Sequence, residues 1–225
     1  MSGKHSVANQ VAAKGYALIR NYCPEESTIE TCSRLGIVDS VEGLDTIQRL
    51  VPREFTEAPP NTYSGNFGTL DFPLHTDLAH WSTPPRYFAL RCRYGASTVA
   101  TRLFDAECVI REFGTESLRR ALVQPRRPMR NGKQLLRLLE RVDGLGLNRI
   151  RWDSVYLKPA SKYAEGICSR VKHYLDASAS EEITLMESGD TLIVDNWRAL
   201  HGRTSANHDD ARDRCIERVF LRALT

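Results

Sequence analysis

Short apolar segments separated by polar turns dominate the hydrophobic pattern of the chain. Many short strands with few helices predict a mainly β fold with flanking helices, built on a barrel or jelly-roll core. Strands are predicted where apolar residues run or alternate, at residues 15–20, 86–93, 99–104, 149–157, 183–186, 190–195 and 215–221. Helices are predicted at residues 24–35, 105–122 and 160–175, and a Pro-, Asn-, Ser- and Gly-rich loop at residues 57–69.

Specific residues mark the ends of two of these helices. Pro24 is expected near the start of the first helix and Gly36 just after its end, which are the positions these residue types favour. Ser161 is expected to cap the helix over residues 160–175, because a hydroxyl can accept a hydrogen bond from the first helical turn.

Composition predicts one globular domain over residues 1–225, with residues 1–13 as a flexible N-terminus. That terminus lacks the apolar core of a signal peptide, and no apolar run reaches the length of about 20 residues that spans a bilayer. The formal charge of +3 is too small to indicate nucleic-acid binding. Six cysteines without a C-x-x-C pair predict reduced thiols and a cytoplasmic protein.

Residues 119–141 form the most basic segment of the sequence. A solvated surface is the simpler interpretation. The alternative is a lid or a docking patch for an acidic substrate or an acidic carrier protein. The basic residues are Arg119, Arg120, Arg126, Arg127, Arg130, Lys133, Arg137 and Arg141.

The segment His75-Thr76-Asp77 predicts a metal site. In a strand, residues i and i+2 point to the same face, so His75 and Asp77 could bind one ion. Two histidines and one carboxylate on one face of a metal leave positions open for substrates, an arrangement typical of non-haem Fe(II) oxygenases. An H-x-D triplet alone is weak support, because it arises by chance in many proteins.

The third ligand is expected to be His201, because the strand-like segment GDTLIVDNWRAL precedes it and would hold it rigidly. The other histidines are weaker candidates. His5 lies in the expected flexible terminus, and His80 is only three residues after Asp77. His173 lies in a predicted helix, and His208 in a polar loop.

Residues 72–92 (FPLHTDLAHWSTPPRYFALRC) and 189–203 (GDTLIVDNWRALHGR) resemble the two halves of the iron site in the taurine dioxygenase and clavaminate synthase superfamily. The resemblance extends from about residue 15 to the C-terminus and is loose between about 105 and 180. It implies a double-stranded β-helix, Fe(II) held by His75, Asp77 and His201, and 2-oxoglutarate and O₂ as co-substrates.

The resemblance also implies residues for 2-oxoglutarate, a dianion whose far carboxylate suits the planar fork of arginine. Arg214, thirteen residues after His201, corresponds to the anchoring arginine of the family. Arg218 corresponds to a second arginine that contacts co-substrate or substrate. Thr98 is the expected partner of the anchor, and Thr101 is the alternative.

The expected activity is hydroxylation of a small polar, amino-acid-like metabolite, since Asp77 occupies the position that related halogenases give to a small residue. One alternative is hydroxylation, desaturation or cyclisation of a substrate tethered to a carrier protein, and another is a non-catalytic cupin-like metal-binding module. A homodimer is possible. Substrate contacts are proposed for Tyr63, Ser64, Gly65, Asn66, Phe67, Trp81, Arg151 and Asp153.

Overall fold

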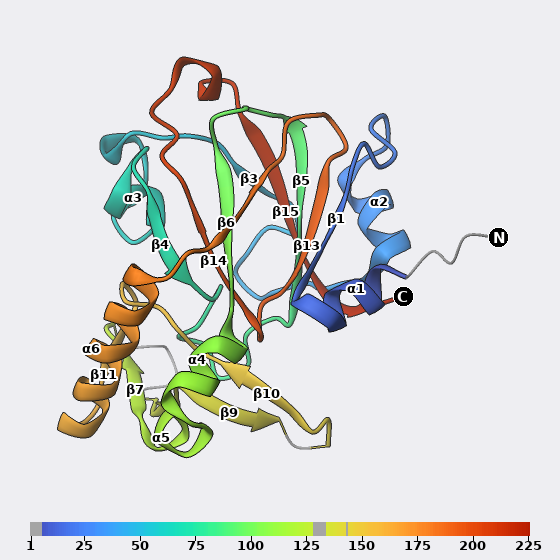
Figure 1. Ribbon diagram of the computed structural model, residues 1–225. Coiled ribbons are helices and arrows are strands. Elements are labelled where there is room, and N and C mark those ends of the chain that lie inside the picture. Colours follow the sequence, from blue (N-terminus) through green and yellow to red (C-terminus); the bar gives the residue numbers. More distant parts are fainter. Residues whose placement is uncertain (1–5, 128–133, 143) are drawn as a thin grey trace.

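Two antiparallel sheets that face each other form the centre of the molecule (Figure 1). The larger sheet has the strand order β1-β13-β5-β15-β2, with β3 also paired to β15, and the smaller sheet has the order β12-β6-β14-β4. This computed structural model describes residues 6–127, 134–142 and 144–225. The fold is therefore mainly β with flanking helices, as the sequence predicts.

Alternate apolar residues of the paired strands face inward and form a core between the two sheets. Phe88, Leu90 and Phe220 from the larger sheet pack with Leu103 and Ala199 from the smaller one. The strands of the larger sheet are β1 (Tyr16–Ile19), β2 (Gly36–Val38), β3 (Gln48–Leu50), β5 (Tyr87–Tyr94), β13 (Thr191–Asp195) and β15 (Cys215–Leu224). Those of the smaller sheet are β4 (Phe72–His75), β6 (Ala100–Asp105), β12 (Glu181–Thr184) and β14 (Ala199–Arg203).

Helices flank both sheets (Figure 1). The helices α1 and α2 pack on the larger sheet, and α4, α5 and α6 pack beside the smaller one with two short sheets. The helices are α1 (Val7–Lys14), α2 (Thr28–Leu35), α3 (Tyr63–Phe67), α4 (Ala106–Phe113), α5 (Thr115–Arg120) and α6 (Lys162–Ala177), with 3-10 turns at Phe55–Glu57 and Asp209–Ala211. The short sheets contain β7 (Leu122–Pro125), β8 (Leu136–Arg137), β9 (Leu139–Val142), β10 (Leu147–Ile150) and β11 (Leu157–Pro159).

Several predicted boundaries are wrong for local reasons. The helix expected at residues 24–35 begins at Thr28, because Ser27 and Glu30 form a reciprocal capping box. The helix expected at residues 105–122 is two helices, separated at Gly114, whose φ of 77° lies in the left-handed region. By contrast, Ser161 caps α6 by accepting from the Ala164 N–H, as predicted.

Three other expectations also change. Residues 7–13 are helical rather than flexible, and Val11 of α1 is buried under the larger sheet. The predicted loop at residues 57–69 contains α3, capped by Thr62. The strand predicted at residues 149–157 is interrupted by a turn, in which Asp153 accepts hydrogen bonds from two backbone N–H groups.

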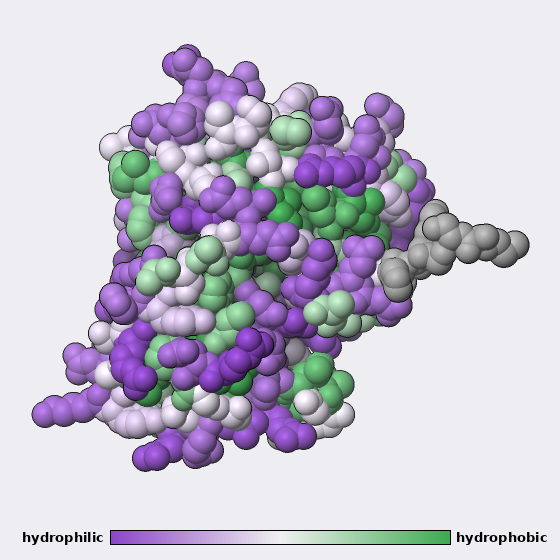
Figure 2. All heavy atoms as spheres, viewed as in Figure 1, coloured by the Kyte–Doolittle hydropathy of each residue, from purple (hydrophilic) through white to green (hydrophobic). Residues whose placement is uncertain are grey.

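Within residues 6–127, 134–142 and 144–225, none of the helices is long and apolar enough to cross a membrane. Figure 2 shows that hydrophilic residues cover most of one face and that hydrophobic residues lie in separate patches. In the basic segment, Arg130 and Lys133 lie outside the described residues. Arg137 donates to the Arg119 carbonyl, and Arg120 stacks on Tyr163.

Candidate functional site

His75, Asp77 and His201 lie together at the inner face of the smaller sheet. One ligand atom from each lies within 4.8 Å of the others, and all three residues are buried. His75 at the end of β4 is directly paired with His201 of β14. The Nε2 atoms of His75 and His201 are 3.9 and 3.6 Å from Oδ1 of Asp77. The structure thus brings the three predicted ligands together.

Asp77 itself lies just beyond β4, so strand alternation does not position it as the sequence analysis assumed. Asn196, buried in the turn between β13 and β14, holds it instead. The Asp77 N–H donates to Asn196 Oδ1 at 2.7 Å, and Asn196 Nδ2 donates to the carbonyls of Asp77 and Pro85 at 3.0 and 2.9 Å. Sequence reasoning missed Asn196, although it stands as a polar residue within block 189–203, the second of the two blocks that resemble the iron site.

The His75 imidazole is prepared to act as a neutral ligand. His75 Nδ1 lies 2.9 Å from the Pro73 carbonyl, which assigns the proton to Nδ1 and leaves the Nε2 lone pair facing the centre of the triad. Burial and then the neighbouring His201 lower the pKa of His75 to about 3. The rings are enclosed, since Tyr63 stacks on His75 at 4.1 Å and Phe88 packs on His201 at 4.7 Å.

Arg218 contacts the carboxylate of the triad directly. Its Nη1 lies 2.7 Å from both oxygens of Asp77, and its Nε and Nη2 donate to Gln48 Oε1 on β3. Burial alone would raise the pKa of Asp77, but Arg218 and then His201 outweigh it and hold that pKa well below its usual range. Asp77 is therefore an anion at neutral pH, as a metal ligand must be.

Arg214 is a buried cation just before β15. Burial lowers its pKa to about 10, and its Nε is buried without a hydrogen-bond partner in the described residues. Burial, and then Arg214, lower the pKa of Arg203 to about 10 as well. Neither arginine has a carboxylate partner within 4 Å in the part of the chain that the structure describes. A buried positive charge of this kind is costly unless an anion pairs with it.

Thr98, the expected partner of Arg214, lies at the surface rather than in this interior. It is exposed in the turn before β6, where its Oγ1 and N–H both bond to Asp210. Thr101, the alternative, is 5% exposed on β6 and directly opposite Arg203 of β14. Directly paired residues project to the same face of an antiparallel sheet, so Thr101 shares the inner face with Arg203 and His201.

The residues proposed for substrate contact divide into two groups. Tyr63 of α3 and Asp153 lie beside the triad, since Asp77 contributes to the raised pKa of each, after burial as the main cause. Arg151 is fully buried, and it donates to Glu140 and to the carbonyls of Ala79, Trp81 and Ser82. Arg151 therefore fixes the turn that follows Asp77. Of the remainder, Ser64, Gly65, Asn66 and Phe67 belong to α3.

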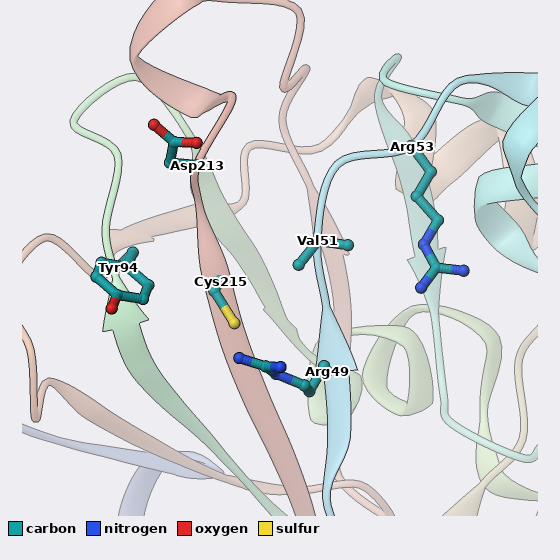
Figure 3. Close-up of a pocket in the computed structure, with 6 residues that line it drawn as sticks. All are labelled: Arg49, Val51, Arg53, Tyr94, Asp213 and Cys215. Atoms are coloured by element: carbon teal, nitrogen blue, oxygen red, sulfur yellow. The ribbon is translucent and has the colours of Figure 1, made fainter.

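A surface hollow of about 570 Å³ is separate from the triad. Figure 3 shows its lining, in which Arg49 points toward Cys215. Gln48 reaches Arg218 on the inner side of the larger sheet, so its neighbour Arg49 projects to the outer side. The hollow therefore lies across the sheet from the buried histidines. Its lining residues are Arg49, Val51, Arg53, Tyr94, Asp213 and Cys215.

Comparison with known proteins finds likeness in structure but not in sequence. No protein-family model matches the chain, and no curated protein matches it. Among solved structures, an asparagine oxygenase in complex with Fe(II), 2S,3S-3-hydroxyasparagine and succinate superposes with a TM-score of 0.69 at 17% identity, covering 92% of this chain and 74% of that one.

Two further oxygenases superpose over similar lengths. PvcB, an Fe, α-ketoglutarate-dependent oxygenase from an isonitrile synthetic pathway, has a TM-score of 0.67 at 19% identity and covers 95% and 77% of the two chains. The non-haem iron oxygenase OrfP in complex with Fe, succinate and (3S)-hydroxy-L-Arg has a TM-score of 0.63 at 17% identity and covers 94% and 76%. The chain has the fold of these oxygenases.

Proposed function

We propose that this protein is a mononuclear non-haem Fe(II) oxygenase that uses 2-oxoglutarate (α-ketoglutarate) and O₂. The observation that carries the proposal is the buried His75–Asp77–His201 cluster, whose ligand atoms lie within 4.8 Å of one another. Two neutral imidazoles and one carboxylate are the donor set of the 2-His-1-carboxylate facial triad. The protonated Nδ1 of His75, which faces Pro73, supports a ligand role for its Nε2.

The proposed architecture is a double-stranded β-helix of one domain over residues 1–225. Its support is the path of the chain, which alternates between the two sheets. It passes from β4 in the smaller sheet to β5 in the larger and back to β6, and later from β12 through β13 and β14 to β15 in the same alternation. This path puts His75 and His201 on neighbouring strands of the smaller sheet, opposite Arg218 of the larger sheet.

The buried cations fit the co-substrate. Fe(II) bound by the triad would supply the chemistry that couples oxidative decarboxylation of 2-oxoglutarate to oxidation of a substrate C–H bond. Arg214 would pair with the far carboxylate of 2-oxoglutarate, and Thr101 is placed to donate to the same group. Arg218 and Gln48 hold the Asp77 carboxylate in place, while Tyr63 and Phe88 exclude water from the histidine rings.

We infer that the substrate is a small amino-acid-like molecule. The products bound in the asparagine oxygenase and OrfP structures are hydroxylated amino acids, and the carboxylate of Asp77 favours hydroxylation over halogenation. A substrate tethered to a carrier protein remains the second candidate, motivated by the basic residues of segment 119–141. The buried Arg214 disfavours a non-catalytic metal-binding module, because without 2-oxoglutarate such a module would leave this cation without an anionic partner. Cytoplasmic location and a possible homodimer remain proposals.

The test is anaerobic titration of the Fe(II) protein with 2-oxoglutarate, followed by the metal-to-ligand charge-transfer absorption. We expect the band in the wild type and in Arg218→Lys, and its loss or a weaker affinity of at least about tenfold in Arg214→Met, since a charge-assisted pair is removed. Arg212→Met, which alters an exposed arginine whose ion-pair partner Asp209 is also exposed, is the control. A wild-type protein that binds Fe(II) but develops no band would refute the proposed function.

A further inference from the structure

Asp153 is a buried carboxylate that the proposed iron and 2-oxoglutarate chemistry does not use. It lies in the turn between β10 and β11 and is 4% exposed. Its Oδ1 accepts from the N–H groups of Val155 and Tyr156, both at 2.8 Å. No backbone N–H donates to its Oδ2, and no basic side chain lies within 4 Å of the carboxylate among the described residues. The negative charge of this buried carboxylate is therefore not paired with a cation.

The groups around Asp153 are aromatic and polar. Tyr63 stacks on the iron-site histidine His75, and its buried hydroxyl has no hydrogen-bond partner of regular geometry. The Tyr63 hydroxyl lies close enough to Asp153 for a weak hydrogen bond with its carboxylate, which raises the pKa of Tyr63 further after burial, although the geometry is poorer than that of a regular hydrogen bond. Tyr156 packs edge-on to Tyr63 at 5.5 Å, and the ring of His80, whose buried Nδ1 is also unpaired, lies 5.7 Å from Tyr156.

The neighbouring charges do not neutralise Asp153. Arg151, two residues away, is committed to Glu140 and to three backbone carbonyls of residues 79–82. Asp77 adds a second negative charge on the triad side, which contributes to the raised pKa of Asp153 after burial as the main cause. A buried carboxylate without a cationic partner, bordered by polar atoms and aromatic rings, is a site for a cation.

The chemistry of the free atoms selects the kind of cation. A guanidinium favours two carboxylate oxygens in a bidentate pair, but Oδ1 of Asp153 is already engaged by two backbone N–H groups. A primary ammonium carries three donors around one charge and can use Oδ2, the Tyr63 hydroxyl and an aromatic face together.

We propose that Asp153 and Tyr63 bind a primary ammonium group of the substrate beside the iron-site histidine His75. The proposal rests on the proposed function and deepens it: the substrate is a free amine, such as an amino acid with an unmodified ammonium group, and not a neutral amide or a carboxylic acid without nitrogen.

The test uses the Fe(II)- and 2-oxoglutarate-loaded protein with the twenty standard L-amino acids and their N-acetyl derivatives, assayed for succinate release. We expect one or more free amines to stimulate succinate release and their N-acetyl derivatives to fail. Asp153→Asn keeps the Oδ1 acceptor and the side-chain volume but removes the charge. It should lower kcat/KM for the active amine on the order of 100-fold, mainly through KM. Tyr63→Phe should lower it by about tenfold.

Asp209→Asn, which alters an exposed carboxylate, is the matched control and should behave as the wild type. The charge-transfer band with 2-oxoglutarate separates the two proposals, because Asp153→Asn should keep it. A missing band in the wild type contradicts the oxygenase proposal itself. If the band forms, the ammonium site is wrong when Asp153→Asn turns over amines normally, when N-acetyl derivatives work equally well, or when no free amine of the panel has an effect.

Discussion

The buried carboxylate of Asp153 should impose a measurable cost on folding that grows as the pH rises from about 4 through 6. Burial, the largest cause, raises the pKa of Asp153 from 3.8 to about 6, against the opposing hydrogen bonds from the Tyr156 and Val155 N–H groups. The folded state therefore holds the proton more tightly than the unfolded chain does. Its stability is fully present below about pH 4 and is lost as the pH rises through 6.

The size of this loss follows from the two pKa values. A difference of about 2 in pKa corresponds to roughly 3 kcal/mol when the carboxyl is fully ionised at pH 8, and to about half of that at pH 5. Because Asp153 is only 4% exposed, solvent screening reduces this figure little. Asp153→Asn cannot ionise, so the variant avoids the loss while keeping the acceptor for the two backbone N–H groups.

The assay is urea unfolding of the metal-free protein at several pH values between 5 and 8. We expect the free energy of unfolding of Asp153→Asn, relative to wild type, to increase by about 1.5 kcal/mol over this range. Asp209→Asn serves as the exposed control and should show no such trend. A difference that is constant with pH, or that changes in the opposite direction, would show that Asp153 is already neutralised in the folded protein.

Three further variants test the groups around the triad. Asn196→Ala leaves the Asp77 N–H and two carbonyls unpaired, so we expect a loss of about 2–4 kcal/mol in urea unfolding and a 10- to 100-fold weaker Fe(II) affinity by chelator competition. Gln48→Leu removes the acceptor that orients Arg218 and should weaken Fe(II) binding by about tenfold in the same assay. Thr101→Val should raise the KM for 2-oxoglutarate by about tenfold, whereas Thr98→Val should leave it unchanged; the reverse order would restore Thr98 as the partner.

Features that depend on nearby residues could be predicted from the sequence. The cap of α6 at Ser161 and the stop of α2 at Gly36 are local, and so is the spacing that joins His75 to Asp77. The start of α2 could also be predicted, because Ser27 and Glu30 have the three-residue spacing of a capping box. The prediction instead used Pro24 as the start signal and placed the start too early. The break at Gly114 depends on a left-handed φ, which a helical hydrophobic pattern does not reveal.

Features that depend on strand register could not be predicted in the same way. Asn196 is 119 residues from Asp77, and Gln48 is 170 residues from Arg218, so only the folded sheets bring these partners together. Thr98 and Thr101 are three residues apart and look equivalent in the sequence. The pairing of β6 with β14 distinguishes them, since it buries Thr101 opposite Arg203 and leaves Thr98 in an exposed turn.

The charges around the triad are distributed asymmetrically, and no single sequence motif reveals this asymmetry. Along β4, Arg203 pairs with Phe72 before the His75–His201 pair, and the turn that holds Asp153 is bonded to Thr76 just after it. Unpaired positive charge therefore lies on one side of the triad and unpaired negative charge on the other. A dianion such as 2-oxoglutarate is attracted to the first side and repelled from the second, and an ammonium group has the opposite preference. Electrostatic repulsion would thus keep 2-oxoglutarate out of the ammonium site and the ammonium group out of the 2-oxoglutarate site, even before differences in shape distinguish the two reactants.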